Sequence, residues 1–281
     1  MLRLASLPIP VSRLFPEQHV EVTPALVAYF PLGCALALCR AAVWAVCAAL
    51  DSPTLTDSDA ALEFIISKLL GVSTSWSGLE NIPRDLGFHV AVSNHTCVGD
   101  FLLLYRQPRQ YNHLIHAAVP TGGRVTRHRV QFTHSTPAAF KRLAKLVKRP
   151  PSTAVTPIHL FPEGCMSSGA GVLKFSRGFA LLDAPVVPIA CRAKHAFSIS
   201  THTLTSSFGA NLFWLCFAPW TTLSATVLPP MWRDVGESHE AFVERVRGAI
   251  AAALDVPLVD LGVREKYSLK ELGRAVPQAR V

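Results

Sequence analysis

A short polar run between two apolar segments holds the side chains best suited to chemistry. It extends from Asn94 to Asp100, reads NHTCVGD, and follows the apolar run 88–93. We expect a strand, a turn and a helix there, and α/β proteins place working side chains at such strand ends. The turn can fold the Asp100 carboxylate onto one ring nitrogen of His95, leaving the other nitrogen free to take a proton from a hydroxyl. The plainer alternative is that His95 caps the turn and Asp100 caps the helix.

A second signal is the sequence Phe161-Pro162-Glu163-Gly164, which ends another apolar run, residues 156–161. Gly164 permits a tight turn, because glycine tolerates backbone angles that other residues avoid. Glu163 could bind the hydroxyls of a polyol or hold an arginine in place. Alternatively, it is an ordinary turn carboxylate.

The charges are unevenly distributed along the chain. Residues 101–162 contain no Asp or Glu, whereas the whole chain has 27 Lys and Arg against 19 Asp and Glu. The ten cations of this stretch are Arg106, Arg109, Arg124, Arg127, Arg129, Lys141, Arg142, Lys145, Lys148 and Arg149. Such a field attracts substrate phosphates, lipid headgroups or nucleic acid, or it forms a solvated basic face. Aromatic residues do not alternate with the cations and no nucleic-acid-binding module is recognisable, so we expect no nucleic-acid partner.

Composition narrows the class of protein further. Half of the residues are apolar and 16% are charged, below the roughly 25% of ordinary globular chains, so a membrane contact is expected. The seven cysteines show no Cys-x-x-Cys pair, which argues against a disulfide scaffold or a metal site and favours a reducing compartment. No Gly-x-Ser-x-Gly motif is present, and neither Cys97 nor Cys165 has the context of a nucleophile. A serine or cysteine hydrolase is therefore disfavoured.

The elements that position these residues can be read from the apolar pattern. Runs 88–93, 156–161 and 186–191 are typical of buried strands, and helical stretches separate them. This order predicts an α/β fold with a mostly parallel sheet flanked by helices. Residues 60–70 and 238–254 have helical spacing, with Ser238 as a candidate N-cap. Residues 208–231 are either a membrane-interface segment or strands that close the sheet.

Residues 24–50 form the longest apolar segment and exceed the roughly 20 residues that span a bilayer. Pro31 and Gly33 interrupt it, and Arg40 is its only charge. We favour a bent hairpin that lets Arg40 reach the headgroups, over a spanning helix or a buried pair of helices. The expected organisation is an N-terminal tail and membrane segment (1–55), an α/β domain (56–258) and a short tail (259–281).

Taken in order, these motifs resemble a known family. His-x4-Asp after a strand, then Phe-Pro-Glu-Gly, then an apolar strand with Val187-Pro188-Ile189, resembles the glycerol-phosphate and lysophospholipid acyltransferases over roughly residues 25–255. Four stretches are similar to the branch called ancient ubiquitous protein 1: YFPLGCALALCR, GVLKFSRGFALLDAPVVPI, LFWLCFAPW and VGESHEAFVERV. Members of that branch also carry a ubiquitin-binding CUE domain, which we expect this chain to lack.

The resemblance implies a glycerol-phosphate-acyltransferase-like domain with a defined chemistry. His95 would be the general base on the acceptor hydroxyl and Asp100 its orienting partner. The hydroxyl would attack the thioester of acyl-CoA directly, without an acyl-enzyme, a metal or a prosthetic group. The acceptor's glycerol-phosphate end would be held by Phe161, Pro162, Glu163 and Gly164. Pro188 would shape the acyl pocket.

The family resemblance also implies a location and a set of partners. The protein would lie on the cytosolic face of the endoplasmic reticulum or a lipid droplet. Its partners would be acyl-CoA, a lysolipid or glycerol-phosphate acceptor, and membrane lipids. The basic stretch would meet acceptor phosphate, CoA phosphates or anionic headgroups.

The chain departs from the family pattern at the phosphate-binding residues. The family usually has Thr after Phe-Pro-Glu-Gly and often a following Arg, where this chain has Cys165 and Met166. A second motif usually supplies an Arg, and the equivalent segment QFTHST has His134 there. Arg127 or Arg129 could substitute. These departures leave a second reading open, a catalytically reduced membrane adaptor that uses the same fold.

Overall fold

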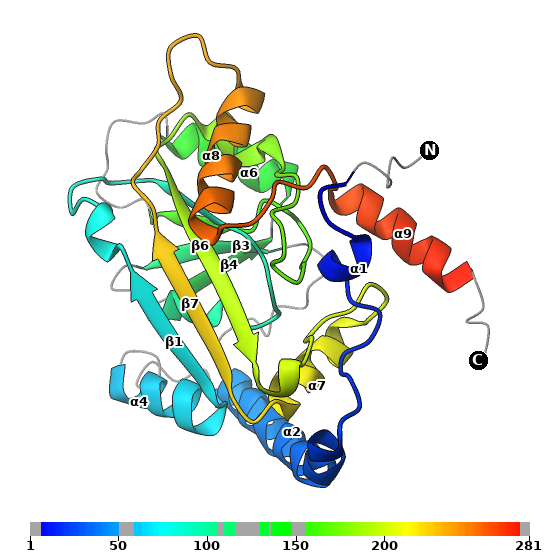
Figure 1. Cartoon of the computed structure of the whole chain (residues 1–281). Helices are drawn as coiled ribbons and strands as arrows, with labels where there is room; N and C mark the ends of the chain where they lie inside the picture. The colour runs from blue at the N-terminus through cyan, green and yellow to red at the C-terminus, as the bar shows by residue number, and fades with distance from the viewer. Residues whose placement is uncertain are drawn as a thin grey trace.

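A seven-stranded sheet forms the centre of the fold in the computed structural model (Figure 1). The structure describes residues 7–50, 59–105, 110–115, 130–134, 136–147 and 156–275. The strand order is β1-β7-β6-β2-β5-β3-β4, and every neighbouring pair is parallel except β6 with β7. The strands are β1 (Val72–Ser77), β2 (Val90–Ser93), β3 (Tyr111–Ile115), β4 (Val130–His134), β5 (Ile158–Leu160), β6 (Val186–His195) and β7 (Thr221–Val227). The predicted α/β class with a mostly parallel sheet is therefore confirmed.

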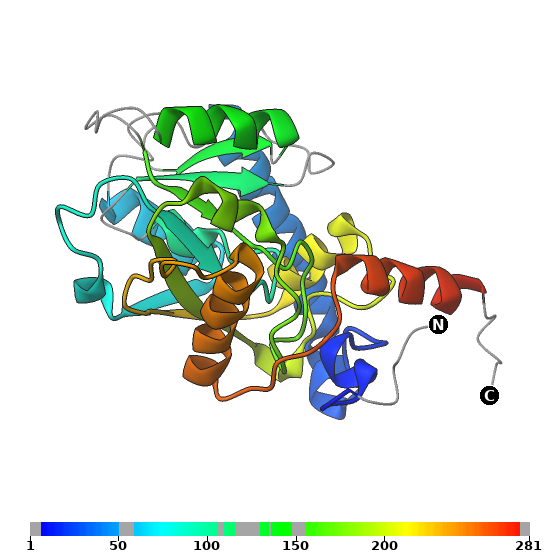
Figure 2. The same cartoon turned by 90° about the horizontal axis from the view of Figure 1, so that it is seen from above.

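Helices cover the sheet on both faces (Figure 2). Successive side chains of a strand point to opposite faces, so Val90 and Val92 of β2 pack with α6 (Pro137–Val147) and α8 (His239–Leu254), whereas Ala91 packs on the other side. That other side is covered by α5 (Leu102–Tyr105) and by a π-helical segment (Phe64–Leu69) that follows α4 (Asp59–Glu63). Ser238 caps α8, as predicted, by accepting a hydrogen bond from the backbone N–H of Ala241.

Shorter elements connect these layers. They are α1 (Val11–Leu14) and the 3₁₀ turns Leu79–Asn81, Arg177–Leu182 and Ala196–Ser198. The segment 208–231 is half helix and half strand. Its first part is α7 (Phe208–Phe217), and its second part contains β7, which extends the sheet between β1 and β6. The C-terminal stretch 259–281 contains α9 (Val263–Ala275), which lies beside α1 in Figure 1.

Residues 24–50 form one continuous helix, α2 (Pro24–Leu50), that runs through Pro31. The preferred hairpin is therefore wrong. Arg40 does not need lipid headgroups, because the fold itself supplies the partners of this side chain, which is only 5% exposed. The guanidinium donates hydrogen bonds to the carbonyl oxygens of Leu69, Cys216, Ala218 and Pro219. Three of these carbonyls lie at the C-terminal end of α7, where a helix carries partial negative charge.

Candidate active site

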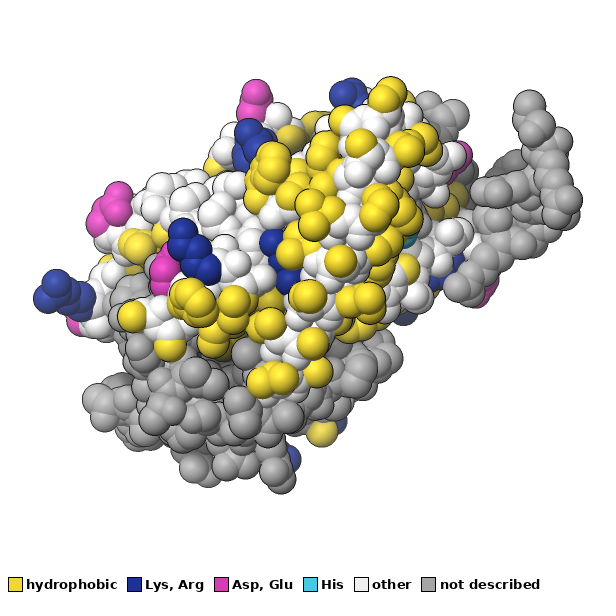
Figure 3. Space-filling view, turned by 90° about the horizontal axis from the view of Figure 1, so that it is seen from below, with side chains coloured by type: hydrophobic (Ala, Val, Ile, Leu, Met, Phe, Trp, Pro, Cys, Tyr) yellow, Lys and Arg dark blue, Asp and Glu magenta, His cyan; other side chains and the backbone are white. Residues whose placement is uncertain are grey.

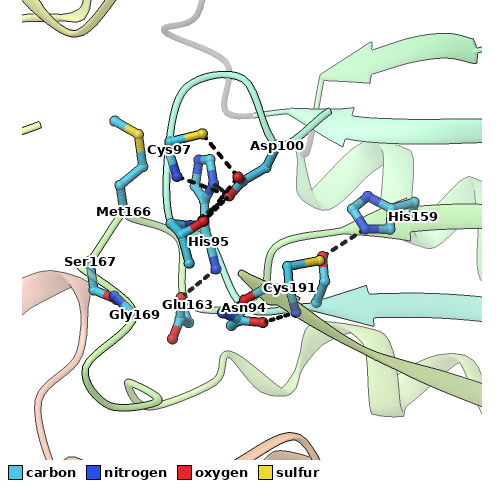
Figure 4. A network of polar contacts seen from close by, with 12 residues as sticks. Asn94, His95, Cys97, Asp100, His159, Glu163, Met166, Ser167, Gly169 and Cys191 are labelled. Atoms are coloured by element: carbon cyan, nitrogen blue, oxygen red, sulfur yellow. Dashed lines mark hydrogen bonds and ion pairs between the residues drawn. The ribbon is translucent and has the colours of Figure 1, made fainter. Parts of the chain in front are cut away.

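His95 and Asp100 meet at the carboxyl end of β2, as their spacing predicted (Figure 4). His95 Nδ1 lies 3.0 Å from Asp100 Oδ2, and the His95 side chain remains 20% exposed. A carboxylate accepts hydrogen bonds only, so the proton on this contact belongs to Nδ1. The imidazole Nε2 then carries a lone pair, which is the arrangement that a general base requires.

Asp100 is held by the turn that it closes. Its carboxylate accepts from the backbone N–H of Thr96 at 2.5 Å and of Cys97 at 3.0 Å, and from the Thr96 hydroxyl at 3.0 Å. Burial alone would raise the pKa of Asp100, but the hydrogen bond and the charge of His95, with the bonds from Cys97, lower it below its usual value. The carboxylate therefore stays charged behind the imidazole at neutral pH.

Glu163 holds His95 from the opposite side, through the backbone. The His95 N–H donates to Oε2 and the Leu173 N–H donates to Oε1, each at 2.8 Å. The side chain is 1% exposed, and burial raises its pKa to about 8 against the lowering effect of these two N–H groups. Its contacts make Glu163 a positioning residue for His95. The role predicted from the resemblance, holding the acceptor, stays a prediction.

The turn after β5 completes the frame around His95. Gly164 has a φ of 68° and donates its N–H to the carbonyl of Phe161 at 3.1 Å, so a glycine suits this position. Further on, the N–H of Ser167 donates to the His95 carbonyl at 2.9 Å. Both backbone groups of His95 are thus bonded to this loop. The two predicted motifs therefore form one site.

Phe161 shapes the site with its ring. It stacks on the His95 imidazole with centroids 4.0 Å apart and planes 8° from parallel. Its other contacts are edge-on to His113 and His159, which are buried on β3 and β5. His159 bonds His113 at 2.8 Å and Ser93 at 2.8 Å. Burial lowers the pKa of His113 to about 3, so the ring stays neutral at neutral pH.

The buried pair His113 and His159 was not predicted from the sequence, although the positions of the two residues could have indicated it. His113 and His159 occupy directly paired positions on neighbouring parallel strands. The role of Asn94 was not predicted either. Its side-chain amide bonds both the N–H and the carbonyl of Cys191 on β6. This clamp fixes the start of the His95 turn to the adjacent strand.

The other predicted site residues have no contact with His95 among those described here, or lie outside the residues that the structure describes. Pro162 is buried, and its carbonyl accepts from the N–H of Ser176 at 2.8 Å. Pro188 is buried in β6 on the face that α8 covers, in register with Val92. His134 ends the edge strand β4, and its side chain is not described. Arg127 and Arg129 lie outside the described residues. Their roles in substrate binding stay predictions.

The described part of the chain contains no cluster of side chains that could bind a metal ion. No group of three or more His, Cys, Asp or Glu side chains gathers there as a metal site would require. The six cysteines described there are free, and Cys97 points its thiol at the Asp100 carboxylate from 3.1 Å. The absence of a cofactor stays a prediction.

Known proteins share this fold and parts of this sequence. No family model matches the chain. The lipid droplet-regulating VLDL assembly factor AUP1 of Danio rerio is 32% identical over 124 residues, which are 43% of this chain and 29% of that protein. Glycerol-3-phosphate acyltransferase 4 of Homo sapiens is 28% identical over 180 residues, 61% of this chain and 39% of that protein. The chain thus covers well under two thirds of these relatives.

A solved structure has the same architecture. It is the 1-acyl-sn-glycerophosphate acyltransferase PlsC of Thermotoga maritima, with a TM-score of 0.54 and 16% identity, covering 81% of this chain and 96% of that one. At this identity the likeness establishes the fold. The fold, the relatives and the order of the motifs agree. The chain therefore resembles the glycerolipid acyltransferases in its fold, in parts of its sequence and in its motifs. His95 and Asp100 match the His-x4-Asp motif of these proteins by residue type and spacing.

Proposed function

We propose that the protein transfers an acyl group from acyl-CoA to a hydroxyl of a lysophospholipid or glycerol-phosphate acceptor. The observation that carries this proposal is the bond between His95 Nδ1 and the charged Asp100, which directs Nε2 outward as a base. The resemblance to the glycerolipid acyltransferases supports acyl transfer to a glycerolipid as the class of reaction.

The geometry supports a direct transfer. His95 Nε2 takes the proton of the acceptor hydroxyl while its oxygen attacks the thioester carbonyl. Asp100 stabilises the imidazolium that forms. The tetrahedral intermediate then collapses, the carbon–sulfur bond breaks, and the leaving CoA sulfur receives the proton from His95. The products are the acylated lipid and free CoA, and the enzyme returns to its starting state.

The test is acyl transfer by purified protein from labelled acyl-CoA to a panel of lysolipids and glycerol-3-phosphate. We expect product with at least one acceptor, and a loss of roughly 10³-fold or more in His95→Ala, since this variant removes the proposed base. His239→Ala is a matched control, because this histidine contacts Asp183 at the surface. Equal activity in His95→Ala and the wild type would contradict the proposal.

A second function has support from the AUP1 relatives, whose name describes a lipid-droplet regulator and assembly factor. In this reading the protein is a membrane adaptor that has kept the acyltransferase fold. Absence of product from every acceptor, with folded protein in lipid, would favour the adaptor.

Attachment to a membrane is part of the same proposal. In the described part of the chain, α2 is the one helix long and apolar enough to cross a membrane. Figure 3 shows apolar side chains gathered on the face that carries α2 and α7. Exposed apolar residues on these two helices are Val27, Phe30, Leu32, Leu38, Val46, Phe208 and Phe213. We place this face in the cytosolic leaflet of the endoplasmic reticulum or a lipid droplet, with α2 lying along the domain rather than crossing the bilayer.

Flotation with phosphatidylcholine vesicles tests whether this face attaches the protein to a membrane. The variant Leu32→Glu/Leu38→Glu removes two exposed apolar side chains and adds two charges, and we expect vesicle binding to fall by about 10-fold or more. Leu181→Glu is the control, because Leu181 is 53% exposed and lies far along the chain in the turn Arg177–Leu182. Equal flotation of the double variant and the wild type would remove this face from the proposal.

A further inference from the structure

The first described residues of the chain lie against the loop that frames the active site. We call residues 9–20 the N-terminal strap and residues 163–173, which follow β5, the β5 loop. The strap contains α1 and leads down to the start of α2 (Figure 1). Two of its side chains, Leu14 and Phe15, are at most 1% exposed and pack with Leu173 of the β5 loop in one apolar cluster. The strap and the β5 loop are therefore packed together, although they lie far apart in the sequence.

Two neighbouring amides of the β5 loop connect the strap to His95. The Ser167 N–H donates to the His95 carbonyl at 2.9 Å, and the Ser168 N–H donates to the Leu14 carbonyl at 2.8 Å. The Ser168 hydroxyl adds a bond to the carbonyl of Arg13. Only the two soft dihedral angles of Ser167 separate these amides, so a shift of the strap is carried to the main chain of His95.

A second connection runs through Glu163. Its carboxyl group accepts from the His95 N–H and from the Leu173 N–H, each at 2.8 Å. The Leu173 side chain is fully buried in the cluster that contains Leu14 and Phe15 of the strap. Both backbone groups of His95 are therefore linked to the strap by a short series of contacts.

The β5 loop also fits closely between its two neighbours. A Cβ added at Gly169, where φ is 80°, would lie 3.2 Å from the Thr96 side chain in the turn that follows His95. A Cβ added at Gly171 would lie 3.2 Å from Ile9 of the strap. Both distances are shorter than an ordinary contact between carbon atoms, about 3.5–4.0 Å. The main chain of the loop therefore lies directly against both neighbours, and close packing of this kind transmits a displacement.

The lower half of the strap is fixed to the elements around α7. The Leu204 N–H donates to the Pro16 carbonyl at 3.1 Å. His19 and Ser200 form two bonds of 2.7 Å, in which the Ser200 N–H donates to the His19 carbonyl and His19 Nδ1 donates to the Ser200 carbonyl. The His19 ring stacks on Trp214 of α7, with centroids 5.2 Å apart. The strap is thus held along its length, as a support for the β5 loop must be.

We propose that the N-terminal strap positions His95 for the acyl transfer proposed above, and that Leu14 is its principal contact. The inference rests on that proposed function, in which His95 takes the proton of the acceptor. A base works only within hydrogen-bond distance of the hydroxyl, and a misplacement of about 1 Å can lower the rate about 100-fold. The strap reaches the main chain of His95 through the β5 loop, so it acts by position and not by chemistry. A segment that only stabilises the fold would leave kcat unchanged in folded protein.

Steady-state kinetics with the best acceptor tests this role in Leu14→Ala, Leu14→Met and a control, Leu182→Ala. Leu182 is 3% exposed and packs in the cluster between the sheet and the helices α6 and α8, which does not include the strap. We expect kcat to fall by about 10- to 100-fold in Leu14→Ala, with a change of less than about 2-fold in KM. Leu14→Met restores the buried volume and should recover kcat to within about 3-fold. Leu182→Ala should keep kcat within about 2-fold, despite a similar fall in unfolding temperature.

Hydrogen exchange followed by mass spectrometry measures the same connection without turnover. In Leu14→Ala the amides of residues 94–98 and 163–173 should exchange about 10-fold faster or more, because the bonds between these two segments are loosened. Leu182→Ala should leave both segments within about 2-fold of the wild type.

Ser168→Ala covers the case in which Leu14→Ala does not fold. It removes one exposed hydroxyl and its bond to the Arg13 carbonyl, and it keeps the backbone bond to the strap. Exchange in the same two segments should rise by about 3- to 10-fold, as expected for one hydrogen bond. Ser67→Ala is the control, because it removes an exposed hydroxyl that bonds Glu63.

Three results would overturn the proposal. The first is unchanged exchange of both segments in the strap variants. The second is a loss of kcat in Leu182→Ala equal to that in Leu14→Ala, and the third is faster exchange in Leu14→Ala with unchanged kcat. If the wild type transfers no acyl group to any acceptor, the proposed acyl transfer fails, and the exchange measurements alone decide whether the strap holds His95.

Discussion

Two buried carboxyl groups hold His95 from opposite sides, and they are placed in contrasting ways. Asp100 closes the turn after β2 and bonds the imidazole Nδ1 of His95. Glu163 lies in the turn after β5 and bonds the backbone N–H of the same residue. Both side chains are at most 2% exposed. One turn therefore acts on the ring that would do the chemistry, and the other on the main chain that carries it.

The pKa values of these carboxyls shift in opposite directions despite their similar burial. Burial raises both, but Asp100 has an imidazole partner and N–H donors in its own turn, and its net pKa is lowered. Glu163 has two backbone N–H groups, and its pKa stays raised to about 8. Burial alone therefore does not decide the charge of a carboxyl, and the number and kind of its donors do. At neutral pH the negative charge beside His95 therefore lies on Asp100.

Replacement of Asp100 by Asn should lower activity more than replacement of Glu163 by Gln. An Asn can keep its oxygen where Oδ2 accepts from His95, Thr96 and Cys97, with its NH₂ directed at the Thr96 hydroxyl, so the turn is retained. The negative charge that stabilises the imidazolium is lost. We expect kcat to fall by about 10³- to 10⁴-fold with little change in acceptor KM.

Steady-state kinetics with the best acceptor measures this effect. Asp183→Asn serves as the control, because Asp183 forms a surface pair with Arg233 at 2.8 Å. A loss of less than about 10-fold in Asp100→Asn would mean that the charge behind the ring is unimportant. The contrast between the two carboxyls would then have no catalytic meaning.

The sequence predicted the Asp100 side of the site better than the Glu163 side, for a physical reason. The bond from Asp100 to His95 is local, so residue type and spacing are sufficient to propose it. Glu163 bonds the main chain of a residue 68 positions away, and a backbone amide has no signature in the sequence.

The fold shows the same division between local and distant contacts. The apolar runs that contain β2 and β5 and the first six residues of β6 were predicted because buried parallel strands have continuous apolar sequences. The hairpin in residues 24–50 was wrong because Arg40 finds its carbonyl partners largely in residues 216–219, which no local pattern indicates. Pro31 was read as a break, but the helix continues through it at the loss of a backbone hydrogen bond.

Replacement of Glu163 by Gln should affect stability and its pH dependence more than chemistry. The pKa of Glu163 is raised from 4.5 to about 8 on folding, so the folded protein binds more protons than the unfolded chain between these values. The contribution of Glu163 to the free energy of unfolding is therefore full below pH 4.5 and is lost as the pH rises towards 8. Gln cannot titrate, so Glu163→Gln should show a flatter fall in stability between pH 5 and pH 8.

Gln also turns an NH₂ towards one of the two backbone N–H donors, His95 or Leu173, which leaves that donor unpaired and should lower the free energy of unfolding by about 1–3 kcal/mol at pH 5. Urea unfolding at pH 5 and pH 8 measures both effects, with Glu21→Gln as the control, because Glu21 is exposed. An unchanged pH slope in Glu163→Gln would show that Glu163 is already ionised at pH 5. Glu163 would then carry a charge as Asp100 does, and would differ from it only in bonding the backbone of His95 rather than its ring.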